Sequence, residues 1–349
     1  MKLVRRLYAD ASDIPDKTDR AALLKHANAS QTDSRIKGLL SLASAFQDIA
    51  VTIDALDADP WLLNVTNGTL DLRTGQLRQH QQQDLITKLC PVAYDPDATH
   101  EVWDRYLETV TRDSSELTAF LQRAVGYSLT GDVSEEKLFF VHGPAASGKS
   151  TFLESIRALL GGYSRVADFE TFLQRSFSGG PRNDVAHLAG SRFVVSIEVD
   201  EGKKLAEGVV KTLTGGDSVS ARFLYSNIFE FRPTFKLWLA ANHEPKVSDE
   251  DDAMWRRILR VPFDYSIPEG ARDPRVKAVL RSTRDAGPAI LAWAVKGCLA
   301  WQRHGLDVPP AIKEATQDYR HAMDPLADFF QERCVFANNA RVLTQEIVM

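Results

Sequence analysis

Apolar residues follow two different periodicities along this chain of 349 residues. Up to about residue 57 they recur at the spacing of amphipathic helices, and between Glu101 and Tyr127 the same spacing predicts two further helices. A break near residues 113–115 separates these two helices, and a serine there can cap the second. The apolar positions of the first segment are Ala21, Leu23, Leu24, Ala27, Ile36, Leu39, Leu40, Leu42, Ala43 and Phe46.

Other segments carry strand and turn signals. Asn67–Gly68 and Thr74–Gly75 are turn dipeptides, and the second predicts a β-hairpin near residues 67–78. From Lys137 to about residue 264 apolar runs alternate with helical stretches, which is typical of an α/β nucleotide-binding core. Residues 271–305 are again helical in pattern, and Pro309–Pro310 predicts a linker.

We therefore expect four parts. They are a mainly helical region (1–130), an α/β core (131–265), a helical lid (266–306) and the start of a small C-terminal domain (307–349). We expect this last domain to be truncated, because the sequence stops in the middle of an apolar pattern.

A phosphate-binding loop lies between an apolar run at 138–141 and a helical pattern from 152 to 160. This is the G-x-x-x-x-G-K-[ST] motif in its strand–loop–helix context, in which backbone N–H groups and a helix N-terminus face a phosphate. Lys149 can supply charge to the β- and γ-phosphates, and the Ser150 hydroxyl can bind Mg²⁺. The predicted nucleotide-binding residues are Gly143, Pro144, Ala145, Ala146, Ser147, Gly148, Lys149, Ser150 and Thr151.

Two later strand patterns end in polar residues. The run from Arg192 ends at Glu198, which suits the acid that a P-loop NTPase uses for Mg²⁺ and the attacking water. Asp200 and Glu201 could share or take this role. Asn242 ends the second run and would lie next to the γ-phosphate if its strand lay between the loop strand and the Glu198 strand. An Asn that caps a turn is the alternative.

Two further elements could serve DNA or a neighbouring subunit. A helix ending at Gly215 and a β-hairpin with its turn at 225–227 are predicted, and a structural hairpin is as plausible as one that offers Arg222, Tyr225 and Asn227 to nucleic acid. The arginine pair Arg256 and Arg257 follows an acidic turn. It can be a surface pair, or one member can reach a neighbour's γ-phosphate, since Arg257 has no evident role within its own subunit.

Composition and charge further narrow the classes of protein to which this chain can belong. A net charge of −5 excludes a broad basic coat but allows cations confined to a channel. The three cysteines Cys90, Cys298 and Cys334 lie too far apart for a metal motif, and no membrane-spanning run is present, so we expect a cytosolic protein without a membrane partner.

In this order, the motifs resemble those of superfamily 3 helicases, in particular the phage and plasmid primase-helicases related to the poxvirus replicative primase-helicase. The resemblance covers about residues 55–335 and departs from the usual loop at Ser147, where Asn is common. The motifs that carry it are 67–72, 126–131, the loop itself, 211–217 with Arg222, Asn242 with Pro245, and Arg256–Arg257 followed by 261–263.

The resemblance implies an α/β, AAA+-like P-loop ATPase core with a parallel central sheet. A mainly helical domain would precede it, and helices and a truncated small domain, for which a winged helix is one form, would follow. It further implies ATP and Mg²⁺ as cofactors and a homohexameric ring that moves on single-stranded DNA, opens forked DNA and works with a primase or primase-polymerase module.

The resemblance also implies roles for individual residues. Lys149 and Ser150 would bind phosphate and Mg²⁺, and Glu198 would be the Walker B acid. Asn242 would be sensor 1, and Arg257 the trans-acting finger with Arg256 as its alternative.

Two other functions fit part of the pattern. A small-molecule P-loop kinase would explain the phosphate loop but not the Asn242 strand or the arginine pair. A DNA-loading ATPase without unwinding activity is the second alternative, although a non-enzymatic or degenerate form of such a scaffold conflicts with a complete loop and an intact acid.

Overall fold

The computed structural model describes residues 2–46, 49–174, 182–197, 202–248 and 251–324. The chain divides into two compact units, with the boundary in the sequence between Ala58 and Asp59, and each is described by itself. The predicted boundary at residue 130 therefore does not separate compact units, because residues 59–130 pack with the α/β core.

The first unit is helical, as the sequence predicts. Its helices are α1 (Lys2–Ser12), α2 (Lys17–Ser30) and α3 (Asp33–Ala43), followed by a short 3-10 helix (Ile53–Ala55). Asp16 caps α2 by accepting hydrogen bonds from the backbone N–H groups of Thr18 and Asp19. The leucines of α3 are not buried: Leu39, Leu40 and Leu42 are about two-thirds exposed, at 64–66%. The helical spacing therefore predicted the helix α3 correctly, although the apolar residues of this helix are not buried.

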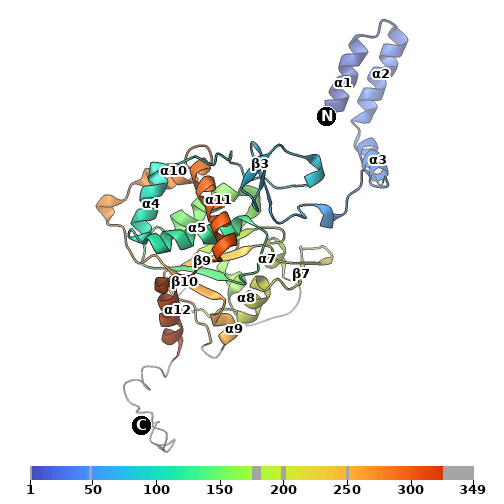
Figure 1. The fold of residues 1–349 in the computed structure, drawn as a ribbon. Coiled ribbons are helices and arrows are strands. Elements are labelled where there is room, and N and C mark those ends of the chain that lie inside the picture. The colour runs from blue at the N-terminus through green and yellow to red at the C-terminus, as the bar shows by residue number, and fades with distance from the viewer. Residues whose placement is uncertain (1, 47–48, 175–181, 198–201, 249–250, 325–349) are drawn as a thin grey trace, which may run out of the picture. The chain divides into compact units, whose positions relative to one another are not determined.

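The second unit is built around a five-stranded parallel sheet (Figure 1). The order of its strands is β10-β4-β9-β6-β5. Its strands are β4 (Leu138–His142), β5 (Ser164–Val166), β6 (Phe193–Ile197), β9 (Lys236–Ala241) and β10 (Ile258–Pro262). The helices are α4 (Glu101–Thr111), α5 (Ser115–Leu129), α6 (Lys149–Leu160), α7 (Asn183–Ala186), α8 (Glu207–Thr214), α9 (Asp252–Trp255), α10 (Pro274–Arg281), α11 (Gly287–His304) and α12 (Pro310–Met323).

Helices cover both faces of this sheet because the strand residues alternate between two cores. Phe139 and Val141 pack with α4, α5, α6 and α11, whereas Leu138 and Phe140 pack with α8, α9 and Tyr319 of α12. Figure 1 shows α4, α5, α10 and α11 on one side of the sheet and α8, α9 and α12 on the other. On the side of the sheet that carries α4, α5, α10 and α11, helices α5 and α11 approach each other so closely that a Cβ on Gly126 would lie 2.1 Å from the backbone nitrogen of Cys298.

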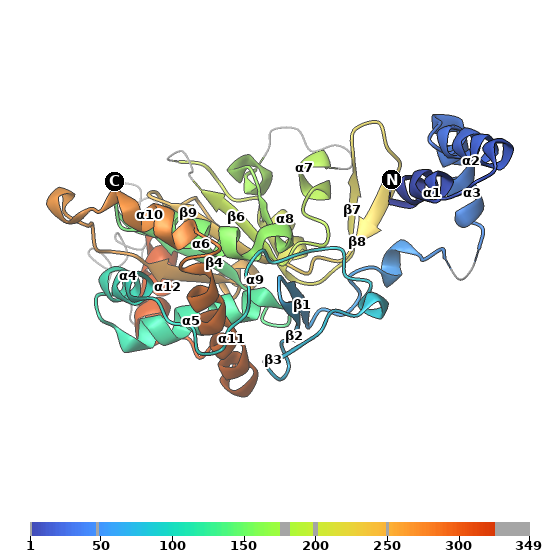
Figure 2. The same ribbon diagram turned by 90° about the horizontal axis from the view of Figure 1, so that it is seen from above.

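Two smaller sheets complete the second unit. The first contains β1 (Leu62–Val65), β2 (Gly68–Asp71) and β3 (Gln76–Arg78), so the predicted hairpin is a three-stranded meander. The second is the predicted hairpin of β7 (Val219–Arg222) and β8 (Ile228–Phe231). Figure 2 shows this hairpin as a ribbon that extends away from the parallel sheet.

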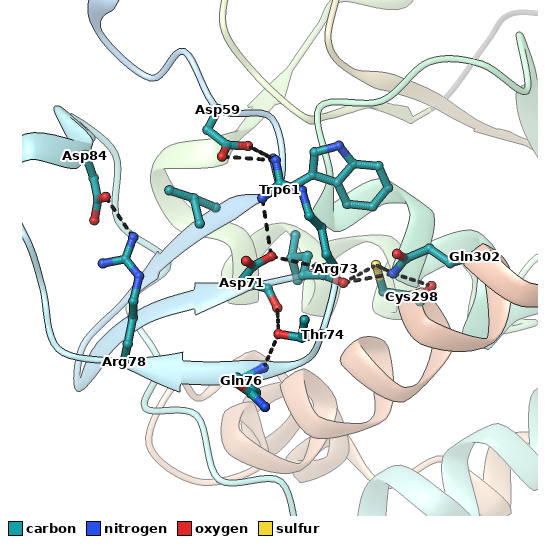
Figure 3. A network of polar contacts seen from close by, with 12 residues as sticks. Asp59, Trp61, Asp71, Arg73, Thr74, Gln76, Arg78, Asp84, Cys298 and Gln302 are labelled. Carbon is teal, nitrogen blue, oxygen red and sulfur yellow. Dashed lines mark hydrogen bonds and ion pairs between the residues drawn. The ribbon is translucent and has the colours of Figure 1, made fainter.

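Polar contacts fix the first small sheet to the rest of the unit (Figure 3). Arg73 pairs with Asp59 at 2.9 Å and lies over the ring of Trp61, which in turn stacks on Trp301 of α11. The Gln302 amide of the same helix donates to the backbone oxygen of Leu72 at 2.8 Å. The meander is thus held against α11 at its turn.

Helix termini follow the sequence closely. Ser114 caps α5 by accepting from the backbone N–H of Leu117, and Gly215 follows the last residue of α8, as predicted. The prediction of a linker at Pro309–Pro310 was wrong, because Pro310 begins α12, where a proline at the first helical position is favourable.

Candidate nucleotide site

The phosphate-binding loop runs from the end of β4 to the start of α6, at the carboxyl edge of the parallel sheet. Gly143 and Gly148 have positive φ angles of 154° and 92°. A Cβ on Gly143 would lie 2.1 Å from the carbonyl oxygen of Phe263, and one on Gly148 would lie 2.7 Å from Val110 Cγ1. Both glycines are therefore required by the neighbours that close over the loop as well as by its backbone conformation.

Helix α4 supports the loop from the segment before the core. The hydroxyl of Tyr106 donates a hydrogen bond to the carbonyl oxygen of Gly148 at 2.8 Å. Burial raises the pKa of Tyr106 above its ordinary value, so this hydroxyl stays a donor at physiological pH. The sequence identified α4 as a helix but gave no signal for this contact, since Tyr106 and Gly148 are 42 positions apart.

The Lys149 ammonium lies within the loop. It donates to the backbone oxygens of Gly143 and Pro144, each at 2.7 Å, and to the Ser147 hydroxyl at 3.2 Å. Its side chain is buried, and burial lowers its pKa. A buried ammonium among neutral oxygens gains strongly from an anion nearby, which is the electrostatic basis of phosphate binding here.

Asn242 lies in the same cavity as the loop. Strand β9 is inserted between β4 and β6, which is the condition under which the sequence placed Asn242 next to the γ-phosphate. The cavity has a volume of about 610 Å³. Its lining comprises residues 145–151 of the loop, Asp168, Phe169, Glu170, Leu173, Ile197, Lys203, Ala240, Ala241 and Asn242.

Three charged residues of this lining were not expected from the sequence: Asp168, Glu170 and Lys203. Asp168 lies just after β5, the edge strand, and caps a 3-10 helix (Phe169–Phe172) by accepting from the Glu170 N–H. A polar residue within two positions of the end of a strand is the signal that located Asn242. It could have located Asp168 had the three-residue strand β5 been recognised.

The chemistry of the cavity suits Mg²⁺ bound together with a nucleotide. Ser150 is exposed to it, and two carboxylates share its lining. Among the residues that the structure describes, no group of three His, Cys, Asp or Glu side chains could hold a metal alone. Mg²⁺ usually takes one or two protein oxygens and completes its shell with phosphate oxygens and water, so these residues fit the ion. Glu198, Asp200 and Glu201 lie outside the described residues.

A second cavity of about 420 Å³ continues from the loop. It shares Ala146, Gly148 and Thr151 with the first, and its other walls come from α4 and from residues 267–277. Ile267 is held at the loop because its N–H donates to the Ala146 oxygen at 3.1 Å. A polar cavity thus continues into a partly apolar one, which matches a ligand with a phosphate tail and a ring system.

The two arginines differ in their surroundings. Arg257 is tied to its own unit: it pairs with Glu136 at 2.8 Å and donates to the Ala253 oxygen at 2.8 Å. The expectation that it has no role inside its own subunit was therefore wrong. Arg256 is exposed, and its side chain makes no hydrogen bond or ion pair with any residue in the described ranges.

The β7–β8 hairpin presents its tip to solvent. Arg222, Tyr225 and Asn227 are all exposed, and Tyr225, at 98% exposure, occupies the left-handed region with φ 60°. Phe223 stacks on Phe229 with ring centroids 5.4 Å apart, which stiffens the base of the tip. The three predicted DNA-contacting residues lie together there, and none of them lines the nucleotide cavity.

Comparisons with known proteins bear on this site. Residues 1–112 match the family described as "D5 N terminal like", and residues 141–257 match a family described as one of unknown function (DUF5906). "Putative helicase L207/L206" of Acanthamoeba polyphaga mimivirus is 26% identical over 82% of this chain and 32% of its own length. "Putative primase C962R" of African swine fever virus is 22% identical over 89% of this chain and 34% of its own length.

These matches confirm the relationship expected from the motifs: the chain carries a D5 N terminal like region and is related to viral proteins named helicase or primase. It spans about a third of the length of these relatives.

The fold is shared with a solved structure, the C-terminal region (305–718) of NrS-1. The TM-score is 0.53 at 10% identity, over 68% of this chain and 54% of that one. The α/β fold class with a parallel central sheet and a helical N-terminal region is thereby confirmed. Separately, no helix among the described residues is both long and apolar enough to cross a membrane.

Proposed function

We propose that this chain is the motor part of a replicative DNA helicase of superfamily 3, encoded by a phage, plasmid or other mobile element. In this proposal it hydrolyses ATP with Mg²⁺, moves on single-stranded DNA and separates the strands of forked DNA. The relatives named helicase and primase support this class, and a primase or primase-polymerase module would act with it.

The observation that carries the proposal is the common cavity of the phosphate loop and Asn242. A loop alone fits any P-loop enzyme, including a small-molecule kinase. An inserted strand that brings an amide to the same cavity supports an ATPase that positions a water and senses the γ-phosphate. The second cavity would take the nucleoside half of ATP.

Each residue has a defined task in this proposal. Lys149 would exchange its contacts with loop oxygens for the β- and γ-phosphates and would balance the charge that develops there. Ser150 would hold Mg²⁺, which neutralises phosphate charge when bound. Asn242 would orient the attacking water. Glu198 remains our candidate for the Walker B acid, which would hold Mg²⁺ through water and polarise the attacking water, with Asp200 and Glu201 as alternatives.

We further propose a ring, with six copies as the expected number, in which each site is completed by a neighbour. The exposed Arg256 is the better candidate for the trans-acting finger, since Arg257 is engaged by Glu136. The hairpin residues Arg222, Tyr225 and Asn227 would face the central channel and grip one DNA strand by phosphate contact and stacking.

Steady-state hydrolysis and fork unwinding test this function together. Wild-type protein should hydrolyse ATP only with Mg²⁺, faster with single-stranded DNA, and should separate a labelled fork. Phosphoryl transfer to a small acceptor with no response to DNA would instead identify a kinase. DNA-stimulated hydrolysis without strand separation would identify a loading ATPase.

A further inference from the structure

Next to the nucleotide cavity, three ionisable side chains form a cluster that the proposed function does not use. We call His142, Glu244 and Arg260 the ionic cluster. The Arg260 guanidinium donates from Nε to Glu244 Oε1 at 2.6 Å and from Nη2 to His142 Nδ1 at 2.8 Å. All three side chains are largely buried, with exposed fractions of 16–19%.

The place of the cluster in the fold is informative. His142 ends β4 and directly precedes Gly143 of the phosphate loop. Glu244 lies two positions after Asn242 in the turn that follows β9. Arg260 lies in the middle of β10, on the other side of β4. One guanidinium therefore joins the loop strand to the turn that carries Asn242.

Arg260 is the donor between two acceptors. A guanidinium only donates, so the bond to Nδ1 requires that this nitrogen carry no proton and that His142 be neutral, with its proton on Nε2. Burial, then the charge of Arg260, lowers the pKa of His142; Lys149 acts in the same direction, while Glu244 and Asp264 oppose it. Without Arg260, Nδ1 and the Glu244 carboxylate would face each other at 3.8 Å with no donor between them.

Helix α12 supports the cluster from outside. The N–H of Arg260 donates to the Thr316 hydroxyl at 3.0 Å, and the hydroxyl of Tyr319 donates to the backbone oxygen of Pro245, the residue after Glu244. Tyr319 is buried and packs on both Phe140 of β4 and Trp255. A shift of α12 would thus move β10 and the turn after β9 together.

We propose that Arg260 is a positioning residue for ATP hydrolysis, which sets the turn bearing Asn242 relative to the phosphate loop with α12 as its outer support. This rests on the proposed ATPase function. Arg260 would not touch nucleotide, since it is absent from the lining of the nucleotide cavity. Its effect should therefore fall on turnover more than on nucleotide binding, because a displacement of about 1 Å at a reacting group can cost ~10²-fold in rate.

The test separates kcat from nucleotide affinity in four variants. Arg260→Ala should lower kcat about 10- to 100-fold while the Kd for a fluorescent ATP analogue changes less than about threefold. Arg260→Lys should recover part of the loss, since an ammonium keeps the positive charge but lacks the rigid planar fork that holds two acceptors at fixed positions. Tyr319→Phe, which deletes one hydroxyl outside the lining of the nucleotide cavity, should lower kcat severalfold. Arg303→Ala is the matched control and should leave kcat unchanged, because this exposed arginine of α11 lines neither cavity and its side chain makes no hydrogen bond or ion pair among the described residues.

The pH profile gives a readout that a purely structural role would not move. Because the pKa of His142 is lowered in the folded protein, its neutral form is favoured, and acidification through that pKa places a proton on Nδ1 facing Arg260. Wild-type kcat should fall on this acid side. His142→Asn keeps an acceptor at the Nδ1 position and cannot titrate, so it should keep kcat at pH 8 and lose that acid-side fall.

The proposal is overturned if folded Arg260→Ala and Tyr319→Phe proteins keep wild-type kcat and lose only thermal stability. If Arg260→Ala does not fold, an unchanged kcat in Tyr319→Phe together with an unchanged pH profile in His142→Asn overturns it equally. Failure of the ATPase function itself is a different result: wild-type protein would then lack hydrolysis that depends on Lys149.

Discussion

Replacement by alanine should have different effects on stability and activity at the adjacent residues Arg256 and Arg257, because the structure gives the two arginines different surroundings. Arg257 has a side chain that is 18% exposed, a bond to the Ala253 oxygen and an ion pair with Glu136, itself 48% exposed. A lost hydrogen bond of a charged group costs ~1.5–3 kcal/mol. The half-exposed ion pair adds only about 0.5 kcal/mol after screening.

A partial recovery offsets this cost. The Nε of Arg257 is buried without a hydrogen-bond partner within the described ranges, so its removal relieves some desolvation. A net loss of about 2 kcal/mol remains. In a domain of this size it corresponds to a Tm lowered by roughly 4–8 °C. Arg256→Ala removes no contact of this kind and should stay within about 0.5 kcal/mol of wild type.

For ATPase activity we expect the opposite ranking of the two variants, with the larger loss in Arg256→Ala. Loss of a trans-acting finger costs ~10³-fold or more in kcat, so Arg256→Ala should be nearly inactive while it melts like wild type. Circular dichroism melts and ATPase rates, measured well below the lower Tm, test both halves. Mixing Arg256→Ala with Lys149→Ala subunits should restore part of the hydrolysis, since some interfaces would combine an intact loop with an intact arginine. A fully active Arg256→Ala beside an inactive but folded Arg257→Ala would refute the argument from exposure.

Three further outcomes are expected. Lys149→Ala should lower kcat by ~10²-fold or more, measured by phosphate release, because developing phosphate charge loses its buried cation; undiminished turnover would contradict the site. Replacement of Arg222, Tyr225 and Asn227 by alanine should abolish DNA stimulation and unwinding, yet preserve basal ATPase, in fork assays; normal unwinding would make the hairpin structural. Burial lowers the pKa of Lys236 in the folded protein. Between that lowered pKa and about pH 10.4, the unfolded chain binds more protons than the folded chain, so the free energy of unfolding should rise with pH. Urea unfolding at several pH values should show this rise in wild type but not in Lys236→Met.

The amino-acid sequence alone was sufficient for the local features of this protein. The phosphate loop, the helices on either side of residue 114, the end of α8 at Gly215 and the β7–β8 hairpin all follow from periodicity and from capping or turn residues. These signals lie within a few positions of one another, and the backbone hydrogen bonds and side-chain spacing that they determine span the same short range.

Tertiary structure decided which of these features meet. Strand β9 lies between β4 and β6 only because the sheet order departs from the chain order, and this places Asn242 beside the loop. Arg257 finds its partner 121 positions away, and Arg260 joins two segments that the sequence offers no reason to connect. The free energy of such a contact depends on distance and burial in the folded chain, and neither is encoded by the residues that flank it.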